Sequence, residues 1–255
     1  MIVAMIGGGG GVGTSTLGLL LSVALREGEI ADGKIADREV VLLEAERAGG
    51  TVGARFDLGV DASLQAWVAG LATDPTISVD QFGKRIGDGL RVVPAPVGWT
   101  DTERILTPAV LDMLVAAMTG DDGRSWIVDV GRGGGAASPL IAVADVAVIV
   151  TLGLPEQIVR LPSMVKAVDP VPCVVMVGGR AAWPIDEIQR HCGATAVIES
   201  PEYRLPTDQV VDLVEGRKRR RSLPWRSALQ CRDAVVEAAT RSEPERPAAS
   251  SRSVG

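Results

Sequence analysis

The chain has 255 residues, of which 46% are hydrophobic, 23% are charged and only 3% are aromatic. This balance is that of an ordinary soluble globular protein, and the length suits one domain with one large core. Because aromatic side chains are scarce, Val, Ala, Leu and Ile must fill that core, which favours buried parallel strands flanked by helices. The composition therefore points to the α/β class.

Two further features bear on location and cofactors. Residues 1–25 carry no charged side chain, but five consecutive glycines at 7–11 and the lack of preceding basic residues argue against a signal peptide or a membrane span. The three cysteines are odd in number and far apart, and His191 is the only histidine. These residues give neither a disulfide framework nor a paired metal-ligand motif. We expect a cytoplasmic protein.

The first elements in chain order are a strand, a glycine loop and a buried helix. Residues 2–6 are an apolar run, and residues 17–25 have a helical pattern that is apolar nearly all round. Polar residues 26–38 predict an unusually long connection. Residues 40–43 then predict a second buried strand that ends in acidic residues.

Helices and strands continue to alternate along the rest of the chain. In order, we expect a helix at 61–71, a strand at 90–93, a helix at 108–118, strands at 126–130 and 143–151, a helix at 156–168 bent near Pro162, a strand at 173–177, a helix at 185–192, a strand at 195–198 and helices at 210–215 and 224–240. Such alternation predicts a three-layer α/β fold, in which helices cover both faces of a mainly parallel sheet.

We assign residues 1–240 to a single domain. It includes the basic segment at 216–226 and the last predicted helix at 224–240. Residues 241–255 are dominated by Ser, Pro, Arg, Glu and Ala, a composition that predicts a disordered tail.

The most specific motif is the glycine-rich segment at residues 8–15, which reads Gly-Gly-Gly-Gly-Val-Gly-Thr-Ser. It follows a predicted strand and opens a predicted helix, and it matches the phosphate loop G-x-x-x-x-G-K-[ST] at every element except the lysine. The glycines let backbone N–H groups converge on an anion, and the helix N-terminus adds a partial positive charge. Ser15 stands where a hydroxyl binds Mg²⁺. The pattern predicts a P-loop NTPase fold.

The same loop admits a second interpretation. Gly8, Gly10 and Gly13 also satisfy G-x-G-x-x-G, the dinucleotide-binding pattern, and Glu44 at the end of the second strand could hold a ribose. Against this, residues 14–16 are Thr-Ser-Thr, the hydroxyl-rich helix start that phosphate and Mg²⁺ binding need. Nothing else in the sequence indicates hydride transfer, so a dinucleotide-dependent oxidoreductase stays a remote alternative.

The loop resembles that of the deviant Walker A family, ParA, MinD and their relatives, which reads K-G-G-x-G-K-[ST]-T. Residues 10–13 and 15–16 match it, whereas the signature lysine falls on Gly9 and the Walker lysine on Thr14. Residues 40–50 resemble the family's second strand and switch I loop. Residues 126–131 resemble its Walker-B-type strand and switch II. The resemblance spans roughly residues 1–215.

This resemblance implies roles for particular residues. Ser15 and Asp129 would hold Mg²⁺, Glu46 would stand where relatives position the attacking water, and Arg180 follows the strand after which many relatives read adenine with an asparagine. The residues expected to bind ATP or ADP are, besides Arg180, those of the loop: Gly9, Gly10, Gly11, Val12, Gly13, Thr14, Ser15 and Thr16.

Both family lysines are missing, and their loss has a predictable effect. A threonine hydroxyl supplies one hydrogen bond and no charge, so each absence is expected to cost about 3 kcal/mol of transition-state stabilisation. The backbone cradle is unaffected by these changes. We therefore expect weakened binding of ATP or ADP with Mg²⁺, and weak or absent hydrolysis.

The basic segment is the other distinctive feature. Residues 216–232 hold seven basic residues and no acidic one, five of them consecutive from Arg217 to Arg221. In the resembled family, ParA-like proteins bind DNA through basic residues, and MinD-like proteins attach to membranes through a C-terminal amphipathic helix. Contact with DNA or an anionic membrane is one interpretation, with the protein peripheral to the nucleoid or membrane. A solvated loop beside a helix packed on the core is the other.

Two hypotheses follow from the resemblance. In the first, the protein is an atypical family member, similar to actinobacterial MinD-like proteins or the TadZ/CpaE group, that forms a homodimer and positions a secretion, pilus or partition assembly. In the second, it is a working Mg-ATPase in which Arg132, Arg180 or an arginine of a second subunit replaces the lost lysines.

Overall fold

The computed structural model describes residues 1–31, 39–59, 61–86, 90–97, 102, 104–121, 123–132, 138–201, 203, 205–217, 219 and 222–242. Its strands are β1 Ile2–Gly7, β2 Glu39–Glu44, β3 Lys84–Ile86, β4 Leu90–Val93, β5 Arg124–Asp129, β6 Val146–Leu152, β7 Cys173–Gly178 and β8 Ala196–Ser200. Its helices are α1 Thr14–Ala31, α2 Val52–Arg55, α3 Leu64–Thr73, α5 Pro108–Thr119, α6 Ser138–Ala142, α7 Pro155–Ile158, α8 Leu161–Val168, α9 Ile185–Cys192, α10 Thr207–Val214 and α11 Leu223–Ser242, and residues Val79–Gln81 form a 3-10 turn.

The strands form one eight-stranded sheet in the order β3-β4-β2-β5-β1-β6-β7-β8. Every pairing is parallel except that of β3 with β4, which is antiparallel. This confirms the predicted α/β fold with a mainly parallel sheet. The sequence did not predict the edge strand β3, because three residues reading Lys-Arg-Ile give neither an apolar run nor a clear alternation.

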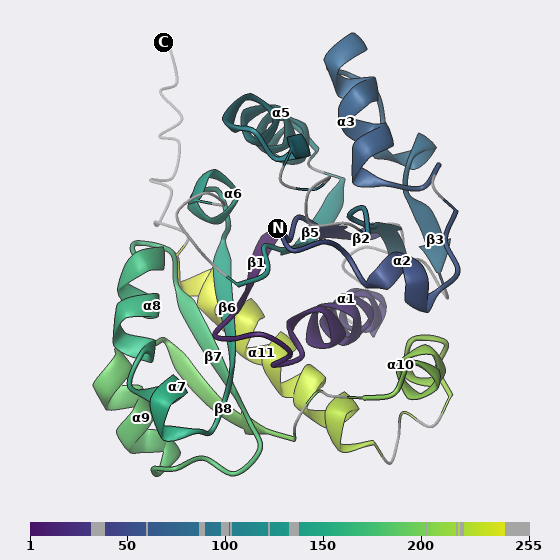
Figure 1. Ribbon diagram of the computed structural model, residues 1–255. Coiled ribbons are helices and arrows are strands. Elements are labelled where there is room, and N and C mark those ends of the chain that lie inside the picture. Colours follow the sequence, from purple (N-terminus) through teal and green to yellow (C-terminus); the bar gives the residue numbers. More distant parts are fainter. Residues whose placement is uncertain are drawn as a thin grey trace, which may run out of the picture.

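Helices cover both faces of the sheet (Figure 1). An apolar layer lies between the sheet and the helices on each face. On β1, Ala4 and Ile6 point into the layer with α3, α5, α8 and α9, whereas Val3 and Met5 point into the layer with α1, α10 and α11. All six residues of β1 are buried. Burial on both faces explains why the central strands read as continuous apolar runs.

The largest correction to a predicted boundary concerns the first helix, whereas the predicted helices at 61–71 and 210–215 and the strand at 143–151 shift by about three residues at one end. Polar residues 26–38 were expected to form a connection, but α1 continues through residues 26–31, and residues 32–38 lie outside the described part of the chain. The extension packs on α11, since a β-carbon on Gly28 would lie 3.2 Å from Cδ of Arg232. This tertiary contact cannot be read from local polarity. The predicted bend near Pro162 is confirmed as a break between α7 and α8, with the proline in the first turn of α8.

An ionic network closes the amino-terminal end of the sheet. The carboxylate of Glu39 on β2 accepts hydrogen bonds from Arg85, Arg91 and Arg124 at 2.9–3.1 Å. Burial of Glu39 opposes its ionisation, but the bonds from Arg91 and Arg124 outweigh that effect and lower the pKa to about 2. Because the side chain of Arg91 is only 7% exposed, the pairing with Glu39 offsets the penalty of a buried charge.

Replacing Glu39 with Gln should lower the free energy of unfolding by about 1–3 kcal/mol at pH 7. Arg91 and Arg124 would lose one of their counter-charges. Both would keep Asp80, and Arg124 would also keep Asp121. The pKa of Glu39 is lower in the folded protein than its ordinary value of 4.5. The contribution of Glu39 to the free energy of unfolding is therefore complete above pH 4.5 and is lost as the pH falls toward 2. Urea unfolding at pH 7, 4.5 and 3 should show the difference between wild type and variant shrinking with acid.

Asp186→Asn is the matched control, because the Asp186–Arg190 pair is more than 70% exposed on both sides. We expect it to change stability by less than about 0.5 kcal/mol. Equal losses for the two variants, or a Glu39→Gln difference that does not depend on pH, would contradict the stabilising role of the network.

Candidate functional site

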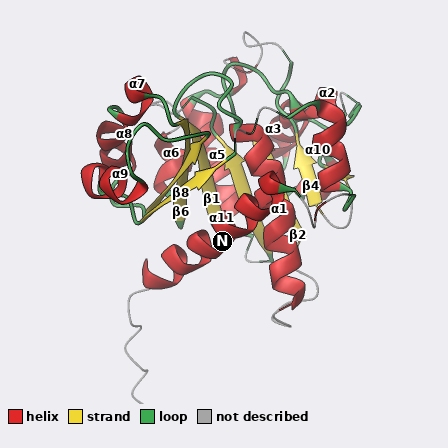
Figure 2. Cartoon of the chain, turned by 90° about the horizontal axis from the view of Figure 1, so that it is seen from below, coloured by secondary structure: helices red, strands yellow, loops and turns green. Residues whose placement is uncertain are grey.

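Three loops meet at the carboxyl end of the sheet, because they follow the adjacent strands β2, β5 and β1. Figure 2 shows loops gathered along this end of the strands. Backbone hydrogen bonds tie them together: the Gly7 amide donates to the Gly131 carbonyl at 2.7 Å, and the Ala45 amide donates to the Asp129 carbonyl at 2.8 Å. The crevice outside the carboxyl ends of parallel strands is the usual ligand site of this fold class.

The glycine loop at residues 8–13 owes its path to backbone conformations that only glycine adopts easily. Gly11 and Gly13 have φ angles of +67° and +93°. Gly13 also has no room for a side chain, since a β-carbon there would lie 2.3 Å from Cβ of Tyr203. The Gly13 carbonyl accepts the first backbone bond of α1, from Leu17 at 2.9 Å. The loop thus leads directly into the N-terminus of an 18-residue helix.

A cavity of about 580 Å³ opens over this loop. Its only charged lining residues among those that the structure describes are Glu46, Arg55 and Arg132. The structure brings together the whole predicted loop and Glu46, and it adds residues that the sequence did not predict. The lining consists of Gly9, Gly10, Gly11, Val12, Gly13, Thr14, Ser15, Thr16, Glu46, Thr51, Arg55, Gly131, Arg132, Tyr203 and Leu205.

Asp129 lies at the end of β5, beneath the start of α1, and is 1% exposed. Its carboxylate accepts hydrogen bonds from the Ser15 hydroxyl and from the Gly131 amide, the latter at 3.0 Å. Burial raises the pKa of Asp129, although these two bonds and the charge of Arg55 act to lower it. Oδ2 of Asp129 has no hydrogen-bond partner among the residues that the structure describes. A buried carboxylate oxygen without a partner, beside a serine hydroxyl, fits a Mg²⁺ site.

Glu44, the last residue of β2, and Glu46, in the loop that follows, have different environments. Glu44 is 1% exposed and accepts bonds from the amides of Thr51 and Val52 at 3.0 and 3.1 Å, and from Ala95 at 3.3 Å. Burial, together with the charge of Asp129, raises the pKa of Glu44 to about 7 despite these bonds. Glu44 therefore anchors the loop and the start of α2. This arrangement does not suit the ribose-binding role of the dinucleotide alternative.

Glu46 instead faces the cavity. It is half-buried, and its side chain packs against Gly131, where an added β-carbon would lie 2.4 Å from Cγ of the glutamate. Burial and the charge of Asp129 raise the pKa of Glu46, whereas Arg132 opposes the shift. The carboxylate of Glu46 belongs to the loop after β2. It is close enough to Asp129 for their charges to interact, and it lines the same cavity as the glycine loop.

The two positions that lack lysine differ in their surroundings. Thr14 is 9% exposed, and its hydroxyl lies 2.8 Å from the place of a β-carbon on Gly7. Gly9 faces Gln157, whose amide nitrogen is 3.4 Å from the position of an added β-carbon. That contact is close to ordinary van der Waals separation. The backbone at residue 9 thus accepts a side chain, although the sequence has none there.

Arg180 is exposed in the loop after β7 and is outside the set of described residues that line the cavity. The loop packs on Gly153, where a β-carbon would lie 2.3 Å from the Arg180 carbonyl. Conversely, Arg55 and Tyr203 line the cavity, but the sequence did not predict them as site residues. Neither stands in a recognisable motif; Tyr203 is notable only as the one tyrosine in the chain.

Two arginines of the basic segment, Arg217 and Arg219, bind neighbouring groups within the chain. Arg217 pairs with Asp212 and Glu215 at 2.7 and 2.6 Å. Arg219 donates to the carbonyls that end α10, pairs with Glu27, and lies 4.8 Å from the ring centroid of Trp225. Residues 218, 220 and 221 are outside the described residues.

Helix α11 packs its apolar side on the core. The residues that share this side and are at most 5% exposed are Trp225, Ala228, Cys231, Val235 and Ala238. This favours the packed-helix interpretation over membrane attachment through α11. Within the described part of the chain, no helix combines the length and apolarity that crossing a bilayer requires.

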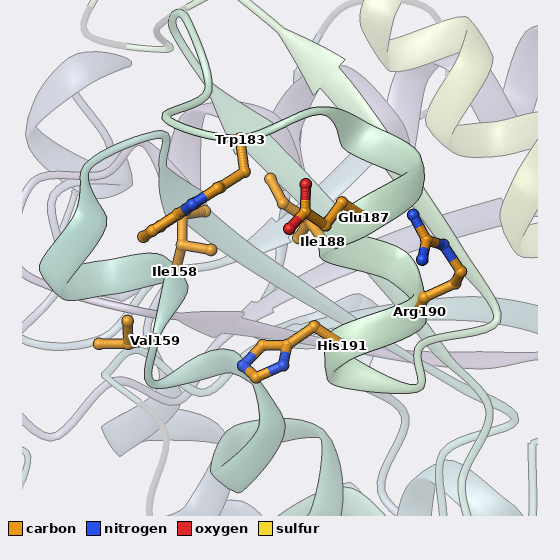
Figure 3. Close-up of a pocket in the computed structure, with 7 residues that line it drawn as sticks. All are labelled: Ile158, Val159, Trp183, Glu187, Ile188, Arg190 and His191. Carbon is orange, nitrogen blue, oxygen red and sulfur yellow. The ribbon is translucent and has the colours of Figure 1, made fainter.

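A second cavity of about 540 Å³ lies beside α7 and α9. Figure 3 shows Trp183 across this cavity from Val159, with Ile188 and His191 on α9. Val159 is 59% exposed and Trp183 is 37% exposed. Apolar residues, Glu187 and Arg190 line this second cavity. The glycine loop and the N-terminus of α1 belong to the first cavity, so we place the candidate site there.

No protein-family model and no curated protein sequence matches the chain. Solved structures do. A Pyrococcus furiosus cell division ATPase MinD is 18% identical, with a TM-score of 0.68 over 92% of this chain and 98% of that one. A ParA family ATPase from Chlorobium tepidum is 15% identical, with a TM-score of 0.65 over 94% and 97%.

The chain has the P-loop NTPase fold of ParA and MinD. A third structure of this ParA/MinD-type fold, the MinD septum site-determining protein from Pyrococcus horikoshii, is described as complexed with Mg-ADP. It is 17% identical, with a TM-score of 0.60 over 95% of each chain. At these identities the likeness concerns the fold, and function must be argued from the residues of the site.

The close packing of Tyr203 on Gly13 gives a test of the loop geometry. Gly11→Ala and Gly13→Ala both place a side chain on a backbone with positive φ, which costs about 1 kcal/mol. Only Gly13→Ala also collides with Tyr203, whereas an added β-carbon at Gly11 meets nothing within 4 Å. Chemical denaturation should therefore show an additional loss of about 1–3 kcal/mol for Gly13→Ala. Equal losses would show that Tyr203 does not close the loop.

Proposed function

We propose that the protein is a ParA/MinD-like scaffold that binds ATP or ADP at the glycine loop, hydrolyses it weakly or not at all, and positions a larger assembly. One observation carries this proposal. The backbone cradle is complete, with its positive-φ glycines and helix N-terminus, yet the two positions where relatives carry lysine are Gly9 and Thr14. The chain has kept the parts that bind an anion and lost the charges that stabilise a transition state.

The residues of the site suggest how binding would proceed. Backbone amides of the glycine loop would donate to phosphate oxygens, and the N-terminus of α1 would add its partial charge. Ser15 and the free oxygen of Asp129 are the groups that would hold Mg²⁺, which neutralises phosphate charge when bound. Thr14 would supply one neutral hydrogen bond in place of a cation.

The same residues suggest why turnover would be slow. Glu46 lines the cavity beside the loop and would orient a water molecule there; burial raises the pKa of its carboxyl. Orientation alone does not replace the missing charges. Without both lysines, the loss of about 3 kcal/mol for each lowers the rate by several powers of ten.

The scaffold role rests on the fold neighbours. Among them is a MinC:MinD cell division protein complex from Aquifex aeolicus, in which a protein of this fold is bound to another protein. We infer a homodimer that recruits components of secretion, pilus or partition machinery, in the manner of the atypical actinobacterial MinD-like and TadZ/CpaE proteins. The basic segment from Arg217 to Arg221 would add contact with DNA or an anionic membrane, through residues beyond the internally paired Arg217 and Arg219.

Restoring the lysine at position 14 tests the proposal. Thr14→Lys should bind Mg-ATP at least about tenfold more tightly than wild type by isothermal titration, because a lysine adds a charge-assisted contact to the phosphates. Thr73→Lys adds the same charge on the exposed last turn of α3 and should leave the affinity unchanged. If Thr14→Lys binds no better than wild type, the assignment of position 14 is wrong.

Steady-state hydrolysis is the second measurement. Wild-type protein with Mg-ATP should show no turnover above background, and Asp129→Ala should leave that rate unchanged. The competing function, a working Mg-ATPase, predicts sustained Mg²⁺-dependent turnover that Asp129→Ala abolishes. That result, alone or with DNA added, would replace the scaffold proposal with the enzymatic one.

A further inference from the structure

The glycine loop brings no charged side chain of its own to the cavity, since residues 1–25 contain none. The positive charge at the site comes from two arginines outside the glycine loop. Arg55 ends α2, and Arg132 follows β5. Both line the cavity together with the glycine loop, although they are 77 positions apart in the sequence. Their convergence depends on the adjacency of β2 and β5 in the sheet.

Arg132 reaches across the glycine loop. Its Nη1 lies 3.5 Å, and its Cζ 3.9 Å, from the position of a β-carbon on Gly10. The residue is exposed, and its guanidinium makes no hydrogen bond or ion pair with any residue that the structure describes. Glu46 is the nearby counter-charge, and Arg132 lowers its pKa in part. A guanidinium with free donors above converging backbone amides suits a phosphate group.

Arg55 lies deeper in the same cavity. It is half-buried, and its Nη1 donates to the Thr16 hydroxyl at 2.9 Å. Its charge acts on Asp129, the carboxylate beneath the loop. The buried Glu44 accepts the amides of Thr51 and Val52 and so fixes the start of the helix that Arg55 ends. This guanidinium is thus held in place before any ligand arrives.

We propose that Arg55 and Arg132 together supply the positive charge for binding and make the cavity a binding site for a polyphosphate chain. Arg55, fixed against Thr16, contacts the inner part of the chain near Asp129. Arg132, exposed over Gly10, closes on the outer phosphate. Guanidinium groups bind phosphate bidentately, so the pair provides both charge and orientation. This inference rests on the proposed function and deepens it, because it names the two arginine side chains that bind phosphate in the absence of lysine.

The test compares binding of two probes, Mg-ATP and inorganic tripolyphosphate, by isothermal titration. Arg132→Ala should weaken both by roughly tenfold or more, and Arg132→Lys should recover only part of the loss, because it restores the charge without the bidentate geometry. Arg55→Lys should weaken both as well. Arg190→Ala, which removes an exposed arginine of α9, is the matched control and should bind like wild type.

A ligand-free melting curve separates binding from folding. Arg132 makes no hydrogen bond or ion pair with the described residues, and its charge acts on Glu46 across the cavity. Arg132→Ala should therefore melt within about 2 °C of wild type while losing most of the upward shift that Mg-ATP causes. If wild type binds both probes and the variants Arg132→Ala and Arg55→Lys bind equally well, the arginine assignment is overturned and the proposed function stands.

The remaining outcomes are also distinct. Wild type could bind tripolyphosphate but not Mg-ATP, with weaker tripolyphosphate binding in the arginine variants. That result would support the assignment of Arg55 and Arg132 to the phosphate site and would remove nucleotide from the proposed function. Failure of wild type to bind either probe at millimolar concentration would overturn both.

Discussion

The parallel ladder that places β1 between β5 and β6 is the constraint on which the site depends. Its register sets Met5 beside Asp129 and Gly7 beside Val150, so the chain leaves β1 between two fixed neighbours. The Gly7 and Gly8 amides then donate to the carbonyls of Gly131 and Val150, each at 2.7 Å. Apolar layers on both faces prevent any shift of register, because a slip of one residue would turn every buried side chain to the opposite layer.

This ladder fixes the separate positions of the backbone groups and of the charged side chains in the site. Backbone groups of the glycine loop form the cradle, and Tyr203 packs against Gly13 from the loop after β8. Side-chain charge enters from the neighbouring loops, with Glu46 and Arg55 following β2 and Arg132 following β5. The buried Glu44 links these parts, since it fixes the loop that carries Glu46 and the helix that carries Arg55.

This division explains how the fold can match ParA and MinD structures at TM-scores of 0.65 and 0.68 with only 15% and 18% identity. A backbone cradle needs glycine at a few positions and little else, so it tolerates change in the surrounding side chains. Charges, by contrast, belong to individual residues and are lost by single substitutions. In this chain the positive-φ glycines and the helix N-terminus are present while the loop carries no lysine, and our proposal of binding without catalysis rests on that combination.

The sequence by itself determined the alternation of strands and helices, the position of the glycine loop and the absence of lysine from it, because local periodicity and glycine content are visible in a single chain. It missed the edge strand β3 and the last turns of α1, which depend on pairing with β4 and contact with Arg232. Only the tertiary structure decided that Arg55 and Tyr203 belong to the cavity and that Arg180 does not line it. The physical reason is that strand order and loop packing bring residues together across distances in sequence over which no local pattern extends.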